Sequence, residues 1–234
     1  WFAAQPAGSD PSAALVVRRL GLQDYVPIFR SMRYLAEHPK PHRSDEIWLL
    51  SHKPVYTQGQ AGKPEHILHP GSTPVVQVDR GGQITYHGPG QLIAYLLINV
   101  RRRKMGVRSL VDLIEQAIIK TLSDYEIEAV TRPGAPGVYV NNAKIAALGL
   151  RIKNGWSYHG LSLNVNMDLS PFGNINPCGF EKLLITQVAD LVPGEEELLQ
   201  SVSRKLADAL LQGLGYNPHY GLSSSEGSRA TLFG

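Results

Sequence analysis

The chain has 234 residues, a net charge of +3 at pH 7 and a single cysteine. Its length suits one large domain and is sufficient for a substantial core. One cysteine excludes an internal disulfide, an iron–sulfur cluster and any metal site built on several cysteines. A free thiol favours a reducing compartment, so we expect the chain to be cytoplasmic. No apolar run approaches the ~18 residues needed to cross a bilayer, so we expect no membrane contact.

Hydrophobic periodicity predicts three helices and one set of strands. Apolar residues recur at helical spacing over residues 24–38, 109–125 and 195–212. Strands are expected at residues 16–17, 46–51, 75–79, 92–100, 137–140, 144–152 and 157–165. The pair Asn154-Gly155 is a strong hairpin signal between the last two. Residues 53–68 and 166–181 are expected to be irregular connections.

These elements predict an α+β (α/β) fold with one mixed central β-sheet and flanking helices. We expect a single domain over residues 15–220. A disordered tail is expected at residues 1–14, because this segment is rich in Ala, Pro, Gly and Ser. A flexible tail is expected at residues 221–234.

Residues 80–91, RGGQITYHGPGQ, form the most informative stretch of the chain. Paired glycines allow the backbone to approach a ligand closely and leave amide N–H groups available to it. Arg80 offers a planar cationic fork, while His87 and Gln91 supply polar side chains. The same pattern is also typical of a simple hairpin with two Gly/Pro turns, and this segment alone does not decide between the two interpretations.

Cys178 lies between Pro177 and Gly179 in the irregular segment 166–181. A lone cysteine is usually a small buried hydrophobe, but a Pro-Cys-Gly turn favours an accessible nucleophile. A free thiol with a pKa near 8.5 is only ~3% thiolate at neutral pH. Lowering that pKa to about 7 needs ~2 kcal/mol, which one cation about 4 Å away can supply.

Three residues compete to be that cation. Lys144 begins an otherwise apolar strand, where a lysine is either an edge residue or a proton shuttle. His87 and His159 are the other candidates, because Cys–His is the commoner dyad. Sequence spacing does not choose among the three.

Several familiar chemistries are missing from the sequence. There is no GxxxxGK[ST] or GxGxxG phosphate loop, no HExxH or CxxC metal motif and no GxSxG elbow. We therefore expect neither ATP nor a metal as cofactor. A nucleophilic cysteine without ATP chemistry suits substrates that arrive already activated, such as thioesters.

The densest basic run is Arg101–Lys104. It is typical either of a solvated loop or of a surface that steers an acidic protein partner. Nucleic acid is not expected, because no helix-turn-helix, zinc or RNA-recognition signature accompanies the run.

Several motifs together resemble those of the bacterial octanoyltransferases, the lipoyl(octanoyl) transferases often called LipB. They are PVYTQGQAG, RGGQITYHGPGQ, RPGAPGVYV followed by KIAALGLRI, and WSYHGLSLNVNMDLSPFGNINPCGF. The likeness covers roughly residues 16–190, with the motifs in matching order and spacing. It implies the fold of lipoate and biotin protein ligases.

The resemblance also implies a function and a site. The reaction would move octanoyl from octanoyl-acyl carrier protein to a lysine of lipoyl domains, in 2-oxoacid dehydrogenase complexes and the glycine cleavage H protein. Cys178 would carry the acyl thioester and Lys144 would tune it. The implied substrate-binding residues are Arg80, Gly81, Gly82, Gln83, Ile84, Thr85, Tyr86, His87, Ala147, Leu148, Gly149, Gly160, Leu161 and Ser162.

Two other functions remain open at this point. An ATP-dependent lipoate or biotin ligase on the same fold would depend on nucleotide and would need no cysteine. A catalytically silent module that binds lipoyl domains or carrier protein would form no covalent adduct.

Overall fold

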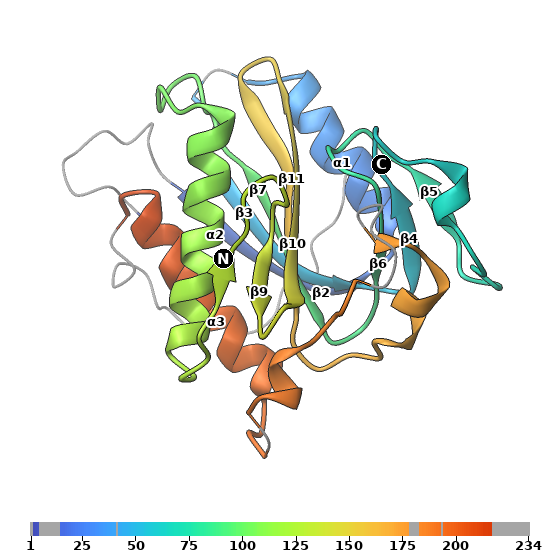
Figure 1. Cartoon of the computed structure of the whole chain (residues 1–234). Helices are drawn as coiled ribbons and strands as arrows, with labels where there is room; N and C mark the ends of the chain where they lie inside the picture. The colour runs from blue at the N-terminus through green and yellow to red at the C-terminus, as the bar shows by residue number, and fades with distance from the viewer. Residues whose placement is uncertain (1, 5–14, 41, 178–182, 193, 217–234) are drawn as a thin grey trace.

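The computed structural model describes residues 2–4, 15–40, 42–177, 183–192 and 194–216 (Figure 1). Its largest element is an eight-stranded sheet in the order β1-β2-β3-β7-β11-β10-β9-β8. The strands are β1 Phe2–Ala4, β2 Leu15–Gln23, β3 Asp45–His52, β7 Gln91–Leu97, β8 Val130–Thr131, β9 Val138–Val140, β10 Ala143–Lys153 and β11 Trp156–Asn164. β2 and β3 are parallel and the other neighbours are antiparallel, so the sheet is mixed as predicted.

A second, smaller sheet carries the central sequence motif. Its order is β5-β4-β6, formed by Val75–Gln77, Val55–Gln58 and Ile84–His87. β4 pairs with β5 in parallel and with β6 in antiparallel fashion. The glycines of the RGG sequence therefore lie in the loop that leads into β6.

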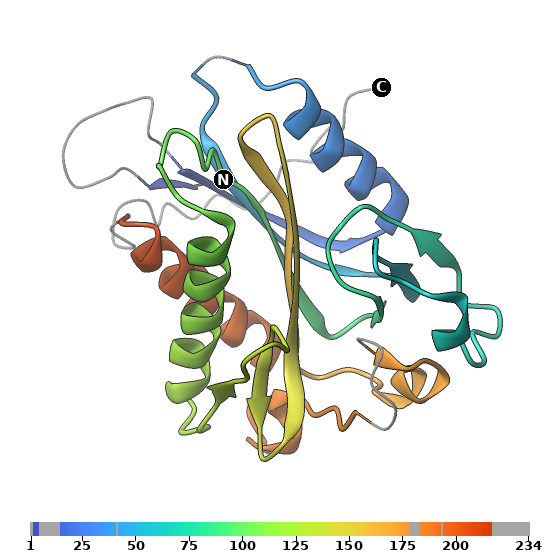
Figure 2. The same ribbon diagram turned by 45° about the horizontal axis from the view of Figure 1, so that its top comes forward.

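Three helices cover the two faces of the large sheet (Figures 1 and 2). α2 (Val107–Ser123) and α3 (Leu198–Gly213) pack against each other on one face, whereas α1 (Tyr25–Glu37) lies on the other. Short 3-10 turns occur at Pro64–His66, Ser170–Asn174 and Val188–Asp190. In the described part of the chain, none of the helices is long and apolar enough to cross a membrane.

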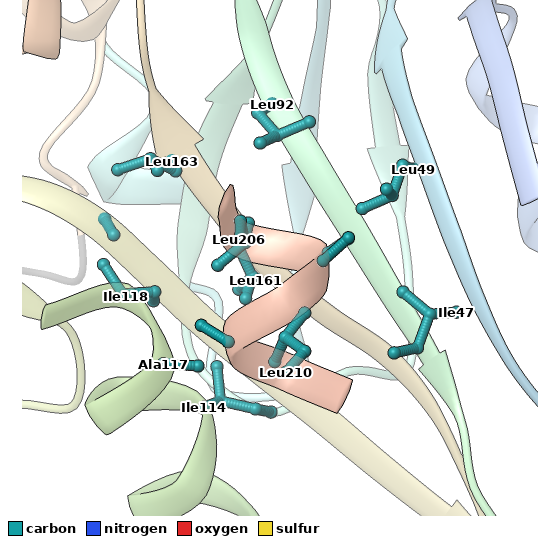
Figure 3. Packing of buried hydrophobic residues seen from close by; sticks show 14 of the residues in the cluster. Ile47, Leu49, Leu92, Ile114, Ala117, Ile118, Leu161, Leu163, Leu206 and Leu210 are labelled. Atoms are coloured by element: carbon teal, nitrogen blue, oxygen red, sulfur yellow. The ribbon is translucent and has the colours of Figure 1, made fainter. Parts of the chain in front are cut away.

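The main core lies between the sheet and the helices α2 and α3 (Figure 3). Ile114 and Ile118 of α2 and Leu206 and Leu210 of α3 are fully buried against the sheet. Alternate residues of the same strands face α1 instead, where Ile28 and Met32 pack in a second cluster. Because both faces are covered, β3, β7 and β11 are buried along their whole length.

The hairpin prediction at Asn154-Gly155 is confirmed. Both residues have positive φ, +51° and +83°, and they join β10 to β11. Two such residues form the turn whose twist matches that of paired strands. The register that follows places Gly149 opposite Gly160 and Ala147 opposite Ser162.

Some elements lie where the sequence predicted none. β1 lies within the predicted tail at residues 1–14 and pairs with β2. The other residues of that tail lie outside the described ranges. β4 and the turn at Pro64–His66 lie inside the predicted connection, and β8 was not predicted. The predicted tail at residues 221–234 lies outside the described ranges.

The basic run at residues 101–104 is partly a structural element. Arg102 and Arg103 form ion pairs of 2.6 and 2.7 Å with Asp45, whose side chain is fully buried. A buried carboxylate needs such partners, because an unpaired buried charge is costly. Arg101 and Lys104 are exposed. Arg102 and Arg103 therefore have a structural contact that neither interpretation of the run included, and the steering of a partner stays a prediction.

Candidate functional site

A cavity in the described part of the chain is lined by residues of both sheets and by the first residue of α1. Its empty volume is about 500 Å³, part of which is open to solvent. The lining residues are Tyr25, Arg80, Gly82, Gln83, Ile84, Thr85, His87, Ile93, Tyr95, Ala147, Leu148, Gly149, His159, Gly160, Leu161 and Ser162. We call this space the acyl cavity, for the ligand that is proposed for it below.

All the substrate-binding residues expected from the sequence line this cavity except Gly81 and Tyr86. The amide of Gly81 donates to the carbonyl of Leu150 at 3.1 Å and so joins the loop to β10. Tyr86 packs edge-on against Phe172 in a separate apolar cluster. Both residues therefore support the fold around the cavity and do not line it.

Gly149 is required for the close approach of the two sheets. A Cβ added at this position would lie 3.0 Å from the carbonyl oxygen of Gly81 and 3.1 Å from Cδ of Arg80. The loop that carries Arg80 can therefore approach β10 only because Gly149 has no side chain.

The sequence did not identify Tyr25, Ile93 and Tyr95 as lining residues. Ile93 lies opposite Ser162 and Tyr95 opposite Gly160, so the register places both beside the expected residues. In the sequence, however, they look like ordinary core positions of a buried strand. Only the strand order shows that this part of β7 faces a cavity.

The guanidinium of Arg80 donates hydrogen bonds to oxygen atoms of the protein itself. Its Nη2 donates to the backbone carbonyl of Thr57 at 2.6 Å, to Thr57 Oγ1 at 3.0 Å and to the carbonyl of Gln83 at 2.8 Å. The guanidinium therefore holds the loop before β6 against β4. Its fork shapes the cavity wall by binding carbonyl groups.

His87 is held at both ring nitrogens. Nδ1 lies 2.8 Å from Gln91 Oε1, and Nε2 lies 3.2 Å from Thr57 Oγ1. Burial lowers the pKa of His87 to about 3. With Nδ1–H donating to Gln91 and Nε2 accepting from the Thr57 hydroxyl, the neutral ring satisfies both contacts. His87 is therefore a neutral wall residue.

The polar contacts continue from His87 toward the other end of the cavity. Gln91 Nε2 donates to Asn164 Oδ1 at 2.9 Å, and Asn164 Nδ2 donates to the carbonyl of Thr186 at 3.0 Å. The amide of Thr186 in turn donates to the carbonyl of Lys144 at 3.1 Å. One hydrogen-bonded chain thus connects the HGPGQ motif to the backbone of Lys144.

Two further histidines, His52 and His159, lie by the cavity. His52 Nε2 lies 2.7 Å from the hydroxyl of Tyr95, and burial lowers the pKa of His52 to about 4. His159 Nε2 lies 3.0 Å from Asp79 Oδ1, and burial lowers its pKa although Asp79 opposes the shift. Burial also raises the pKa of Tyr95 well above its ordinary value. The two imidazoles and the phenol are therefore neutral at neutral pH, with the Asp79 carboxylate in contact with His159.

A second, smaller cavity adjoins the first and contains Lys144. It is lined by Thr85, Lys144, Ala146, Ala147, Ser162, Asn164, Phe172, Pro177 and Ile185. Thr85, Ala147 and Ser162 line both cavities. The two cavities therefore meet at these residues, and the register places Tyr95 opposite Gly160, farther along β11 from Asn164 of the Lys144 cavity.

Lys144 is buried at 4% exposure within this second cavity. Its Nζ donates to the carbonyl of Pro136 at 3.2 Å and lies 5.2 Å from the centre of the Tyr139 ring. Carbonyl oxygen and ring face both favour an ammonium group. Cys178 lies outside the described residues, but Pro177, to which it is bonded, lines the same cavity as Lys144.

Among the described residues, no group of three or more His, Cys, Asp or Glu side chains is placed to hold a metal. The polar groups that line the two cavities are amides, hydroxyls, neutral imidazoles, the Arg80 guanidinium and the Lys144 amine. Such a set suits group transfer to or from a bound organic substrate.

The fold is similar to solved structures of lipoate protein ligases. Lipoate-protein ligase A bound with ATP matches with a TM-score of 0.68 and 13% identity, over 86% of this chain and 84% of that one. The bi-partite lipoate protein ligase from Thermoplasma acidophilum matches with a TM-score of 0.61, 16% identity and coverage of 86% and 82%. The structure therefore has the lipoate protein ligase fold.

The sequence matches the lipoyl protein ligase A/B catalytic domain over residues 24–211. The octanoyltransferase of Pseudomonas entomophila is 57% identical over 88% of this chain and 94% of its own length. Those of Azotobacter vinelandii and Vibrio vulnificus are 56% and 54% identical, with similar coverage. The chain belongs to the octanoyltransferase family, within the lipoyl protein ligase A/B class of catalytic domains.

Proposed function

We propose that this chain transfers an octanoyl group from octanoyl-acyl carrier protein to a lysine of lipoyl domains, through a thioester on Cys178. One observation carries the proposal in this structure: Lys144 and Pro177 line one cavity, and that cavity adjoins the acyl cavity at Thr85, Ala147 and Ser162. The names of the close relatives support octanoyl as the group transferred. In this proposal the thioester carbon lies beside Lys144 and its chain extends into the acyl cavity.

In the first step, the Cys178 thiolate attacks the thioester carbonyl of the donor. A new carbon–sulfur bond forms, the bond to the carrier sulfur breaks, and that sulfur takes a proton from the Lys144 ammonium. Lys144 is then a neutral amine.

In the second step, the neutral amine of the acceptor lysine attacks the acyl-cysteine. The amide bond forms, the carbon–sulfur bond to Cys178 breaks, and the amine gives one proton to Lys144. The thiolate and the ammonium are restored, so the chain needs neither ATP nor metal to complete the cycle.

The acyl cavity suits a fatty chain because its wall is built largely from apolar or small residues, and the guanidinium of Arg80 is directed at protein oxygens of Thr57 and Gln83. Burying a methylene contributes about 0.8 kcal/mol. Tyr95, whose hydroxyl lies 2.7 Å from His52 Nε2, lines the part of the cavity away from Lys144, where the end of the acyl chain would lie. The octanoyl tail would thus lie along the strands β7, β10 and β11.

The proposed acceptors are the lipoyl domains of 2-oxoacid dehydrogenase complexes and the glycine cleavage H protein. We also propose the cytoplasm as the location, since the cysteine must stay reduced. The main alternative is an ATP-dependent ligase. Its support is the fold shared with lipoate-protein ligase A, and that likeness at 13% identity concerns the fold alone.

A transfer assay separates these functions. The chain is incubated with octanoyl-acyl carrier protein and a lipoyl domain, without nucleotide, and the octanoylated domain is measured by mass. We expect transfer by the wild type and none by Cys178→Ala. Transfer only from free octanoate with ATP would favour a ligase, and binding of either protein without transfer would favour a silent binding module.

A further inference from the structure

The carbonyl that holds Lys144 belongs to a peptide group that is itself held by a buried carboxylate. Lys144 Nζ donates to the carbonyl of Pro136 at 3.2 Å. The amide of the next residue, Gly137, donates to Glu115 Oε1 at 2.8 Å. Because the Pro136 carbonyl and the Gly137 N–H form one planar peptide group, a single rigid unit connects Glu115 to Lys144.

The charges at the two ends match the polarity of that peptide group. The carboxylate lies at its N–H end and the ammonium at its carbonyl end. A hydrogen bond to a charged group is stronger than one between neutral groups, and adjacent bonds polarise one another. Glu115 is buried on α2, so its position is fixed by the helix and the core beneath it.

Gly137 can make this contact because it has no side chain. Its φ is +135°, and a Cβ there would lie 2.7 Å from the carbonyl of Ala146 and 3.1 Å from Cε of Lys144. The lysine side chain therefore packs directly on the glycine backbone. Any rotation of the Pro136–Gly137 peptide would move the carbonyl that Lys144 contacts.

We propose that Glu115 is a positioning residue, which places the Lys144 ammonium by fixing the orientation of the Pro136–Gly137 peptide. This inference rests on the proposed function, in which Lys144 serves the cysteine. Glu115 does not touch the substrate and acts only through that peptide. A displacement of about 1 Å in a catalytic group can cost up to 100-fold in rate, so even a small rotation matters.

The test compares Glu115→Ala, Glu115→Gln and Glu115→Asp. Gln keeps an oxygen acceptor of the same reach, whereas Asp keeps the charge on a side chain one methylene shorter. Two rates are measured: alkylation of Cys178 by iodoacetamide as a function of pH, and single-turnover acylation by octanoyl-acyl carrier protein. We expect Ala and Asp to lose about 10-fold in both at pH 7, and Gln to stay within about twofold of the wild type.

Thr121→Val is the matched control. Thr121 is a fully buried polar residue of the same helix, and its hydroxyl donates to the carbonyl of Ala117 at 2.8 Å. This variant perturbs α2 without contacting the peptide, so it should lower the melting temperature and leave both rates unchanged. A loss of rate in Thr121→Val equal to that in Glu115→Ala would overturn the inference.

A double-mutant cycle separates positioning from general destabilisation. In a Lys144→Ala background, Glu115→Ala should have no further effect on either rate, because the group that it positions is gone. Additive losses, unchanged rates in Glu115→Ala alone, or a Gln variant as slow as Ala would each contradict the proposal. A wild type that is never acylated would contradict the proposed function instead, and the alkylation profiles would still test Glu115.

Discussion

Lys144 and Thr186 are joined through the backbone: the Thr186 amide donates to the Lys144 carbonyl at 3.1 Å. The Lys144 amide donates in turn to the carbonyl of Leu184 at 2.7 Å, so residues 184–186 form a short parallel bridge with β10. The chain thus returns to Lys144 soon after residue 178, and Pro177 just before it lines the lysine's cavity. The described residues on both sides of residues 178–182 therefore lie next to Lys144, the proposed partner of Cys178.

The role of Lys144 can be separated into charge and proton transfer. Lys144→Ala should slow acylation and transfer by about 10²–10⁴-fold, the usual contribution of a general acid–base group. It should also shift the alkylation profile of Cys178 to higher pH. Lys144→Arg keeps a charge that is never lost near neutrality, so it should retain part of the acylation and then accumulate octanoyl on Cys178.

His87 is the matched comparison for that experiment, because it was a competing candidate. Both of its nitrogens are occupied by Gln91 and Thr57, so His87→Gln should leave the alkylation profile of Cys178 in place. A shifted profile in His87→Gln, with an unshifted one in Lys144→Ala, would mean that the dyad is assigned to the wrong residue.

The preference for acyl chain length should depend on Tyr95, which lines the part of the acyl cavity away from Lys144. Tyr95→Ala removes the ring and should shift the preference from eight-carbon toward longer thioesters, by about fourfold in kcat/KM per added methylene. Tyr95→Phe keeps the ring and loses only the contact with His52, so it serves as the control. An unchanged preference in folded Tyr95→Ala would show that the acyl end lies elsewhere.

Stability should fall in mild acid because His52 and His87 resist protonation. Burial lowers their pKa values to about 4 and about 3, whereas the unfolded chain takes up protons near the ordinary value of 6.5. Each excluded proton lowers the free energy of unfolding by about 1.4 kcal/mol per pH unit, from about pH 6.5 down to the folded-state pKa. Urea unfolding at pH 7, 6 and 5 measures the slope.

The variants identify the source of that slope. His52→Gln and His87→Gln should each reduce the slope of the unfolding free energy against pH by the contribution of one proton. Thr121→Val should lower the unfolding free energy equally at every pH. If the slope is the same in both histidine variants as in the wild type, other groups are responsible.

The basic run should behave as two different pairs. Replacing Arg102 and Arg103 with Ser leaves the buried Asp45 carboxylate unpaired and should cost about 3–5 kcal/mol of unfolding free energy. Replacing the exposed Arg101 and Lys104 with Ser should change stability by no more than about 0.5 kcal/mol. The measurements are urea unfolding and the salt dependence of kcat/KM.

The position of the run argues that its exposed pair does not steer the partner. Arg101 contacts Gly155 beside Trp156, whereas Lys144 shares its cavity with Asn164 at the other end of β11. Eight residues of strand separate the two ends by roughly 26 Å. We expect the salt dependence of kcat/KM to be unchanged in the Arg101 and Lys104 variant. A weaker salt dependence would restore the docking interpretation.

The sequence predicted the helices, most strands and the hairpin, because these depend on local periodicity and turn chemistry. β1 and β8 have two or three residues each, too few for a period to be visible. β4 was hidden in a segment punctuated by glycines, and it is a strand because β5 and β6 pair with it on both sides. Because this stabilisation comes from neighbouring strands, the sequence of β4 alone carries no pattern that predicts it.

The candidate site was predictable where its residues carry unusual chemistry. Lys144 in an apolar strand and the glycines beside Arg80 stand out in the sequence. Tyr25, Ile93 and Tyr95 do not, since a cavity wall and a packed core require the same residue types. Glu115 looks like one more polar residue of an amphipathic helix, and its contact with Gly137 depends on how α2 packs against the sheet.

The most direct test of the account is the intact mass of the chain after exposure to octanoyl-acyl carrier protein, with and without ATP. Covalent catalysis at Cys178 predicts a gain of one octanoyl group without nucleotide, removed by hydroxylamine and absent in Cys178→Ala. No gain, a gain that requires ATP, or a gain that persists in Cys178→Ala would contradict it.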